Sequence, residues 1–149
     1  MKKNIKIITL LAAIIIAIAA AFFAFVFDKP VSYKNGVKSV SITVKHEMYK
    51  NFSESHTLKP GEQVYIHDTN YVFVITDFMP DFRIKRQTGE AYSRTDAPDN
   101  PAVKIALYVE NEKLDEAWYI LKKKDYYKVF KPGIYFVIDN IVYGDTKYE

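Results

Sequence analysis

The distribution of apolar residues divides the chain into two parts with different patterns. Residues 7 to 27 form an unbroken run of 21 that contains a single polar side chain, a threonine. Beyond this run, apolar and polar residues alternate with a period of two in several short segments. Between residues 39 and 45, for example, Val40, Ile42 and Val44 share one face. This alternation is typical of a half-buried strand, whereas the first run is long enough for a membrane-spanning helix.

Turn-forming residues separate the alternating segments, as at Pro60-Gly61 and Pro132-Gly133. Two stretches break the pattern: His46 to Leu58 is polar and irregular, and Arg83 to Pro101 is expected to be a long ordered loop. We therefore predict an all-β fold, either an antiparallel β-sandwich or a partly open barrel of about seven strands. One N-terminal apolar helix is expected to precede it.

The end of the chain holds two further extended segments. Ile134 to Ile138 and Ile141 to Tyr143 are both rich in apolar residues, and Asp139-Asn140 lies between them. Because Asp and Asn favour turns, we expect two separate strands here.

The charges around the first apolar run predict its orientation. Lys2, Lys3 and Lys6 precede the run, and no acidic residue occurs before Asp28. As a helix, the run would extend about 31 Å, close to the hydrocarbon thickness of a bilayer. Positive charge before an apolar run stays on the cytoplasmic side. We therefore predict a single-pass protein of the cell membrane, anchored by residues 7–27, with its C-terminal domain outside the cytoplasm.

A cleaved signal peptide is the alternative interpretation of the same run. Small residues spaced for cleavage occur at Ala17-Ile18-Ala19, and cleavage would give a secreted protein. However, the apolar run continues to Phe27 and exceeds the roughly 7–15 residues usual for a signal peptide. The expected organisation is a signal-anchor or signal peptide in residues 1–27, a tether in 28–38 and an extracytoplasmic β-domain in 39–149.

Charge and cysteine content limit the possible partners. The chain carries 21 basic and 18 acidic residues, a net charge of +3. Three of the lysines lie in residues 1–27, so the remainder has 18 basic and 18 acidic residues and is neutral. A nucleic-acid-binding domain normally has a basic excess, so we expect no nucleic-acid partner. The absence of cysteine excludes disulfides and thiolate metal sites.

Candidate metal ligands are few and poorly spaced. His46, His56 and His67 lie ten and eleven residues apart, which matches no compact zinc motif, and we expect them to be exposed in loops. Asp96 and Asp99 lie in a segment rich in turn formers and lack the EF-hand pattern. We predict no metal ion and no cofactor.

Candidate catalytic residues are equally weak. Ser53, Ser55 and Ser93 are not part of a Gly-x-Ser-x-Gly motif. Asp77 and Asp81 would lie roughly 13 Å apart on an extended strand, too far for a pair of catalytic carboxylates. We predict no catalytic residue and expect the protein not to be an enzyme.

Two stretches resemble a known family. Residues 71–82 form a strand that ends in Phe-Met-Pro-Asp-Phe, and residues 93–102 read Ser-Arg-Thr-Asp-Ala-Pro-Asp-Asn-Pro-Ala. Together they resemble the exported β-domain of ResB-type cytochrome c biogenesis proteins and small stand-alone exported relatives. The resemblance implies a β-sandwich-like domain outside the cytoplasm and a link to haem delivery. It implies structural roles for Pro80, Asp81, Phe82, Asn100, Pro101 and Trp118.

The absence of a catalytic motif and the high tyrosine content favour a binding function. Exposed aromatic residues are enriched at protein interfaces, and loops on a rigid scaffold commonly carry function. We predict a non-enzymatic, membrane-anchored domain that binds another envelope or membrane protein. The alternatives are an accessory factor in cytochrome c assembly and a carrier of a small apolar ligand. The candidate contact residues lie in the long loop: Lys85, Arg86, Tyr92 and Arg94.

Overall fold

The computed structural model describes residues 36–121, 128–144 and 146–148. Within these ranges the protein is all-β, as predicted, with ten strands where about seven were expected and no helix. The described residues accordingly contain no helix long and apolar enough to cross a membrane. The apolar helix and anchor predicted for residues 1–27, and most of the tether, lie outside the described residues.

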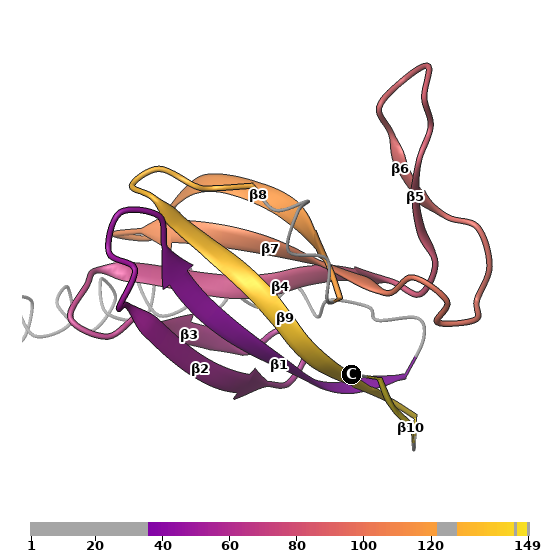
Figure 1. Cartoon of the computed structure of the whole chain (residues 1–149), viewed down its shortest axis with the longest axis horizontal. Coiled ribbons are helices and arrows are strands. Elements are labelled where there is room, and N and C mark those ends of the chain that lie inside the picture. Colours follow the sequence, from indigo (N-terminus) through magenta and orange to yellow (C-terminus); the bar gives the residue numbers. More distant parts are fainter. Residues whose placement is uncertain (1–35, 122–127, 145, 149) are drawn as a thin grey trace, which may run out of the picture. The chain divides into compact units, whose positions relative to one another are not determined.

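Eight of the strands form two four-stranded antiparallel sheets, which we call the two-sheet body (Figure 1). The first sheet has the order β10-β9-β1-β2 and the second has the order β3-β4-β7-β8. The first consists of β1 (Val37–His46), β2 (Ser53–Leu58), β9 (Ile134–Tyr143) and β10 (Thr146–Tyr148). The second consists of β3 (Gln63–Tyr65), β4 (Tyr71–Met79), β7 (Ala102–Val109) and β8 (Glu112–Ile120).

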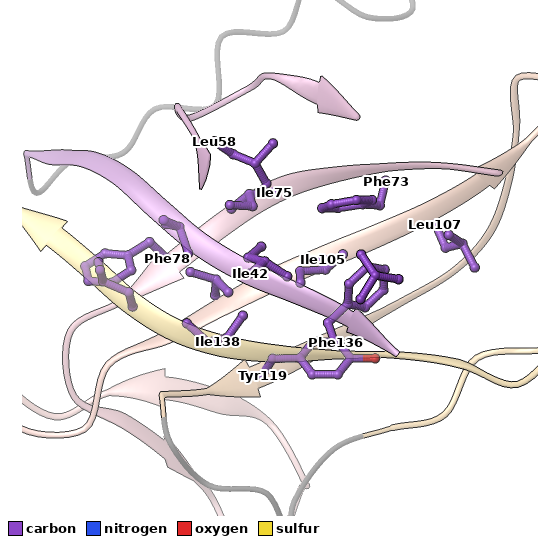
Figure 2. Packing of buried hydrophobic residues seen from close by; sticks show 14 of the residues in the cluster. Ile42, Leu58, Phe73, Ile75, Phe78, Ile105, Leu107, Tyr119, Phe136 and Ile138 are labelled. Atoms are coloured by element: carbon purple, nitrogen blue, oxygen red, sulfur yellow. The ribbon is translucent and has the colours of Figure 1, made fainter. Parts of the chain in front are cut away.

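Apolar side chains from both sheets form one core (Figure 2). Val40, Ile42 and Val44 are buried in alternation along β1, which confirms the face predicted from the sequence. At the centre, the ring of Phe136 from the first sheet lies 4.8 Å from that of Phe73 in the second. Burying a side chain of this size contributes about 1.5–3 kcal/mol to stability, so the core is the main source of stability for the body.

The stretch expected to be irregular, residues 46–58, contains a strand. β2 pairs with β1 in antiparallel register from Val40↔Leu58 to Lys45↔Ser53. The prediction was wrong because β2 is an edge strand whose only buried side chain is Leu58, so it has almost no apolar alternation. Cross-strand hydroxyl contacts, such as Thr43 to Ser55 at 3.1 Å, take the place of apolar pairs.

The two segments expected near the C-terminus are a single strand with an irregularity. In β9, Asn140 pairs with Ser41 and Ile138 pairs with Ile42, so Asp139 is an extra residue. The Asp139 carboxylate accepts a hydrogen bond of 2.7 Å from the hydroxyl of Thr43 on β1. The polar pair that predicted a turn therefore forms a β-bulge within a continuous strand.

The long loop predicted for residues 83–101 also contains regular structure. β5 (Phe82–Ile84) and β6 (Ala91–Ser93) pair as an antiparallel hairpin that is separate from both sheets. We call residues 82–93 the arm; Figure 1 shows it standing away from the body. Three-residue strands are too short to produce a visible alternation, which explains why the sequence indicated a loop.

Candidate interaction site

The arm is fixed at its base by a buried carboxylate. The side chain of Asp81 has no exposed surface, and it is the only buried charged residue among those described. Arg94 Nε lies 2.7 Å from Asp81 Oδ2, and Arg83 Nη2 lies 3.0 Å from Asp81 Oδ1. The Arg83 contact is an ion pair without a well-aligned hydrogen bond, because Asp81 Oδ1 has no hydrogen-bond partner in the described structure. A buried charge persists only when it is paired, so the two arginines hold this carboxylate in place.

Backbone and side-chain hydrogen bonds join the chain at Asp81 to the end of the arm and to Asn100. The amide of Asp81 donates to the hydroxyl of Ser93 at 3.2 Å, and the amide of Arg94 donates to the carbonyl of Asp81 at 3.1 Å. The side-chain amide of Asn100 donates to the carbonyl of Phe82 at 2.7 Å, and the Phe82 amide donates to the Asn100 carbonyl at 2.9 Å. The two ends of the arm are therefore held to each other and to the segment that leads into β7.

The arm base also packs against the body. Phe82 is buried, and its ring centroid lies 5.5 Å from that of Trp118 on β8. Pro80 and Pro101, which flank the base, are buried as well. The structure thus brings together in one place the positions that carry the family resemblance: Pro80, Asp81, Phe82, Asn100, Pro101 and Trp118.

Beyond its base, the arm exposes apolar side chains. Ile84 is 56% exposed and Tyr92 is 38% exposed. Ile84 pairs with Ala91 and Tyr92 pairs with Arg83. Because successive residues of a strand point to opposite faces, Ile84 shares the face of Phe82 and Tyr92 lies on the other. Each face of the arm therefore carries one large exposed apolar group.

The arm also concentrates positive charge. It contains three basic residues and one acidic residue, a net charge of +2, whereas the rest of residues 28–149 has 15 basic and 17 acidic residues, a net charge of −2. Lys85 Nζ lies 2.7 Å from a carboxylate oxygen of Glu90 and 6.0 Å from the ring centroid of Tyr92. Arg86 is exposed at the turn. The arm is thus a small basic projection from a weakly acidic domain.

The predicted contact residues fall into two groups. Lys85, Arg86 and Tyr92 lie on the exposed part of the arm, whereas Arg94 lies at its base in the ion pair with Asp81. Neither Ile84 nor the ion pairs of Asp81 were predicted from the sequence. An isolated isoleucine among basic residues was the available signal for Ile84, since nothing nearby in the sequence would bury it.

The three histidines have different environments, and only His67 is largely exposed. His56 lies on β2, 2.7 Å from a carboxylate oxygen of Glu54. His46 ends β1, and its Nδ1 accepts hydrogen bonds from the amides of Met48 and Tyr49. The expectation of three loop histidines was wrong, because His46 and His56 stabilise local structure. A pocket of about 280 Å³ lies beside His46 and Phe52, open to solvent, and its lining mixes three charged residues with aromatic and apolar ones.

The described part of the chain offers no metal site, and several residues weighed as catalytic candidates take part in local hydrogen bonds. No group of three or more His, Asp or Glu side chains within it could hold a metal ion. Ser93 Oγ donates to the carbonyl of Thr95 at 2.8 Å, and Ser55 is paired with Thr43, so both hydroxyls take part in local structure. Asp77 accepts a hydrogen bond from the adjacent Phe78 amide.

Shifted pKa values occur around β8, and each has a structural cause. A hydrogen bond from Lys128 lowers the pKa of Asp115, and one from Lys104 lowers the pKa of Glu116. Burial raises the pKa of Tyr119, whose hydroxyl donates to the carbonyl of Lys128 at 2.6 Å. These hydrogen bonds and the burial of Tyr119 stabilise the fold around β8.

Comparison with known proteins identifies no relative. No protein-family model matches the chain, and no match was found among curated proteins or among solved structures.

Proposed function

We propose that this protein is a membrane-anchored, extracytoplasmic β-sandwich domain that binds another envelope or membrane protein through the arm. It catalyses no reaction in this proposal. The observation that carries the proposal is the arm itself: a projection locked at its base and exposing Ile84 and Tyr92 to solvent. The anchoring and the extracytoplasmic location rest on the apolar run and the lysines that precede it.

A partner protein would account for features that stability alone does not require. A small two-stranded hairpin is marginally stable by itself, yet this one is held by a buried ion pair and several backbone hydrogen bonds. Exposing the apolar surface of Ile and Tyr side chains to water is unfavourable, and its burial by a partner would lower the free energy. Tyrosine in particular is enriched among residues that dominate interface energetics.

The proposal is tested by removing the exposed apolar groups of the arm. The double variant Ile84→Ser, Tyr92→Ser in the full-length protein should lose the partner that chemical crosslinking recovers from membranes with the wild type. The matched control is Tyr65→Ser, Leu114→Ser, because these residues are an exposed tyrosine and an exposed leucine on the body. Recovery of the same partner, in the same amount, with wild type and with the arm variant would contradict the proposal.

A second candidate function is an accessory role in cytochrome c assembly. It is favoured by the convergence at the arm base of the two separate stretches that carry the ResB-type resemblance, since Asp81 and Asn100 form a β-bridge. On this hypothesis a strain lacking the protein has less mature cytochrome c, measured by haem staining of membrane proteins. Wild-type haem staining in that strain would count against this role while leaving the binding proposal intact.

The third hypothesis, a carrier of a small apolar ligand, has less support. The rings of Phe73, Phe136, Tyr119 and Phe130 lie within 4.8–6.0 Å of their neighbours and occupy the space between the sheets. A ligand would have to displace them or bind elsewhere. Mass spectrometry of the purified protein under native conditions tests the idea, because a carrier would retain lipid or cofactor.

A further inference from the structure

The two faces of the arm constrain the shape of its partner. Ile84 and Tyr92 lie on opposite faces of the hairpin, and both are exposed. A flat surface, such as a bilayer, can cover only one face of a two-stranded ribbon. A cleft in a protein can enclose both faces at once, so burial of both side chains requires a cleft.

The charges of the arm constrain the chemistry of that cleft. Its turn carries Lys85, which is paired with Glu90, and Arg86, so residues 85–90 have a net charge of +1; the apolar residues lie nearer the base. Insertion of the turn into hydrocarbon would bury these cations at a high cost. Carboxylates at the far end of a cleft would instead pair with them while apolar walls contact Ile84 and Tyr92.

The topology places the arm base at the end of the body at which β1 begins. Val37, the first residue of β1, pairs with Tyr143, and the ring of Tyr143 stacks on Phe78 at 5.9 Å. Phe78 lies near the end of β4, only a few residues before Asp81. Figure 1 shows the same arrangement, with β1 beginning at the end of the body from which the arm departs.

The length of the intervening chain limits the distance between this end and the bilayer. Only nine residues, 28 to 36, separate the apolar run from β1. Ten Cα–Cα steps join residue 27 to Val37, so whatever their conformation they cannot span more than about 36 Å. If residues 7–27 are the anchor, β1 therefore begins within about 36 Å of the bilayer surface.

We infer that the arm inserts into a cleft with an acidic inner end on the extracytoplasmic side of an integral membrane protein. This inference rests on the proposed function and adds to it the partner's class, the shape of its site and its charge. The apolar walls bind Ile84 and Tyr92 on opposite faces of the arm, and the acidic end binds Lys85 and Arg86. The same observations make a lipid surface the less favoured occupant.

Site-specific photo-crosslinking in intact membranes tests the inference. Benzoylphenylalanine is placed at position 84, 92 or, as the control on the body, 65 of the full-length protein. A site for a specific protease is inserted between Lys34 and Asn35, so that the domain can be cut from its anchor after illumination. Alkaline carbonate then releases the cut domain unless it is covalently attached to an integral membrane protein.

Positions 84 and 92 should give the same protein adduct, which stays in the membrane pellet after cutting and carbonate treatment. The K85E/R86E variant should reduce both adducts about tenfold, because reversed charges face the acidic end of the cleft. Position 65 should give no such adduct.

Other outcomes overturn the inference in distinguishable ways. A protein adduct that carbonate releases would leave the proposed function standing and exclude an integral membrane partner. An adduct from only one of positions 84 and 92 would exclude a cleft. Lipid adducts from positions 84 and 92 would assign the arm to the bilayer, provided that the full-length protein also crosslinks at these positions to vesicles of 70% zwitterionic and 30% anionic lipid. A protein adduct from position 65 alone would overturn the proposed function itself.

Discussion

The two-sheet body and the arm are held in place by different interactions. In the body, alternating apolar residues from two sheets bury one another, and the rings of Phe73 and Phe136 lie at the centre. In the arm, the strands have three residues each, and the feature that fixes them is the buried carboxylate of Asp81 between two arginines. Apolar burial depends little on direction, whereas an ion pair with hydrogen bonds is directional.

Because of this difference, the stability of the fold depends mainly on the body, whereas the orientation of the arm depends on its base. A change in the body's core affects every strand that shares the core, because unfolding of a small domain is cooperative. A change at Asp81 affects mainly the orientation of the arm, since few apolar contacts join the arm to the body beyond Phe82 and Trp118. The protein can therefore expose apolar side chains on the arm without weakening its core.

The largest effect is expected in the core. Phe136→Ala removes a buried ring that contacts three other aromatic rings, and should lower the free energy of unfolding by about 3–5 kcal/mol. Urea denaturation followed by tryptophan fluorescence measures the change. The neighbouring Val137→Ala, on the other face of β9, should cost less than about 1 kcal/mol. Equal losses for the two variants would contradict the placement of Phe136 in the core shown in Figure 2.

The next effect concerns the base of the arm. Asp81→Asn keeps the shape of the side chain but removes its charge, so Arg83 and Arg94 lose their partner. Both arginines are partly exposed and regain water, so the expected loss of stability is about 1–3 kcal/mol, below that for a fully buried pair. Asp77→Asn, at an exposed aspartate of β4, should change stability by less than about 0.5 kcal/mol. Trypsin should cleave the arm after Lys85 and Arg86 faster in Asp81→Asn than in the wild type, and no faster in Asp77→Asn.

A smaller effect is expected at the buried hydroxyl of the core. Tyr119→Phe removes the hydrogen bond to the carbonyl of Lys128 and should cost about 1 kcal/mol at neutral pH. Burial raises the pKa of Tyr119, so the unfolded chain releases this proton near pH 10 while the folded protein retains it. The stability linked to this group is therefore complete below about pH 10 and is lost as the pH rises further. Wild type should lose stability more steeply than Tyr119→Phe between pH 9 and 11, as urea titrations would measure; parallel curves would contradict this assignment.

The smallest effect is expected on the outer face of the body. Glu116→Gln breaks the ion pairs of Glu116 with Lys104 and Lys113, which are partly exposed, and should cost less than about 1 kcal/mol. The hydrogen bond from Lys104 lowers the pKa of Glu116, so its contribution is present above the ordinary glutamate pKa of about 4.3. It is lost as the pH falls through the lowered value. The difference in melting temperature between wild type and variant should be smaller at pH 3 than at pH 7; a difference of the same size at both pH values would count against the ion pairs.

The sequence predicted the β class and the buried face of β1 because apolar alternation records burial directly. The prediction failed where a strand forms without a matching alternation of apolar residues. β2 is an edge strand with only Leu58 buried, and the bulge at Asp139 resembles a turn in sequence although its neighbours remain paired. The strands of the arm are too short for any periodicity to be read.

The candidate site was predicted in part for a related reason. Lys85, Arg86 and Tyr92 were identified because basic and aromatic residues in a loop stand out. The burial of Asp81 was not foreseen, because it depends on Arg94 and Asn100, which lie next to it only in the folded protein. Sequence spacing alone does not reveal contacts that require a tertiary fold.

Hydrogen–deuterium exchange of the full-length protein and its Asp81→Asn variant tests most directly whether the arm and the body are held separately. In the wild type, the amides of Lys85, Gly89 and Arg94 are hydrogen-bonded and should be protected. In the variant, these amides should exchange much faster while those of β1, β4, β7 and β9 keep their protection. Unchanged protection in the arm, or an equal loss of protection in arm and body, would contradict this prediction.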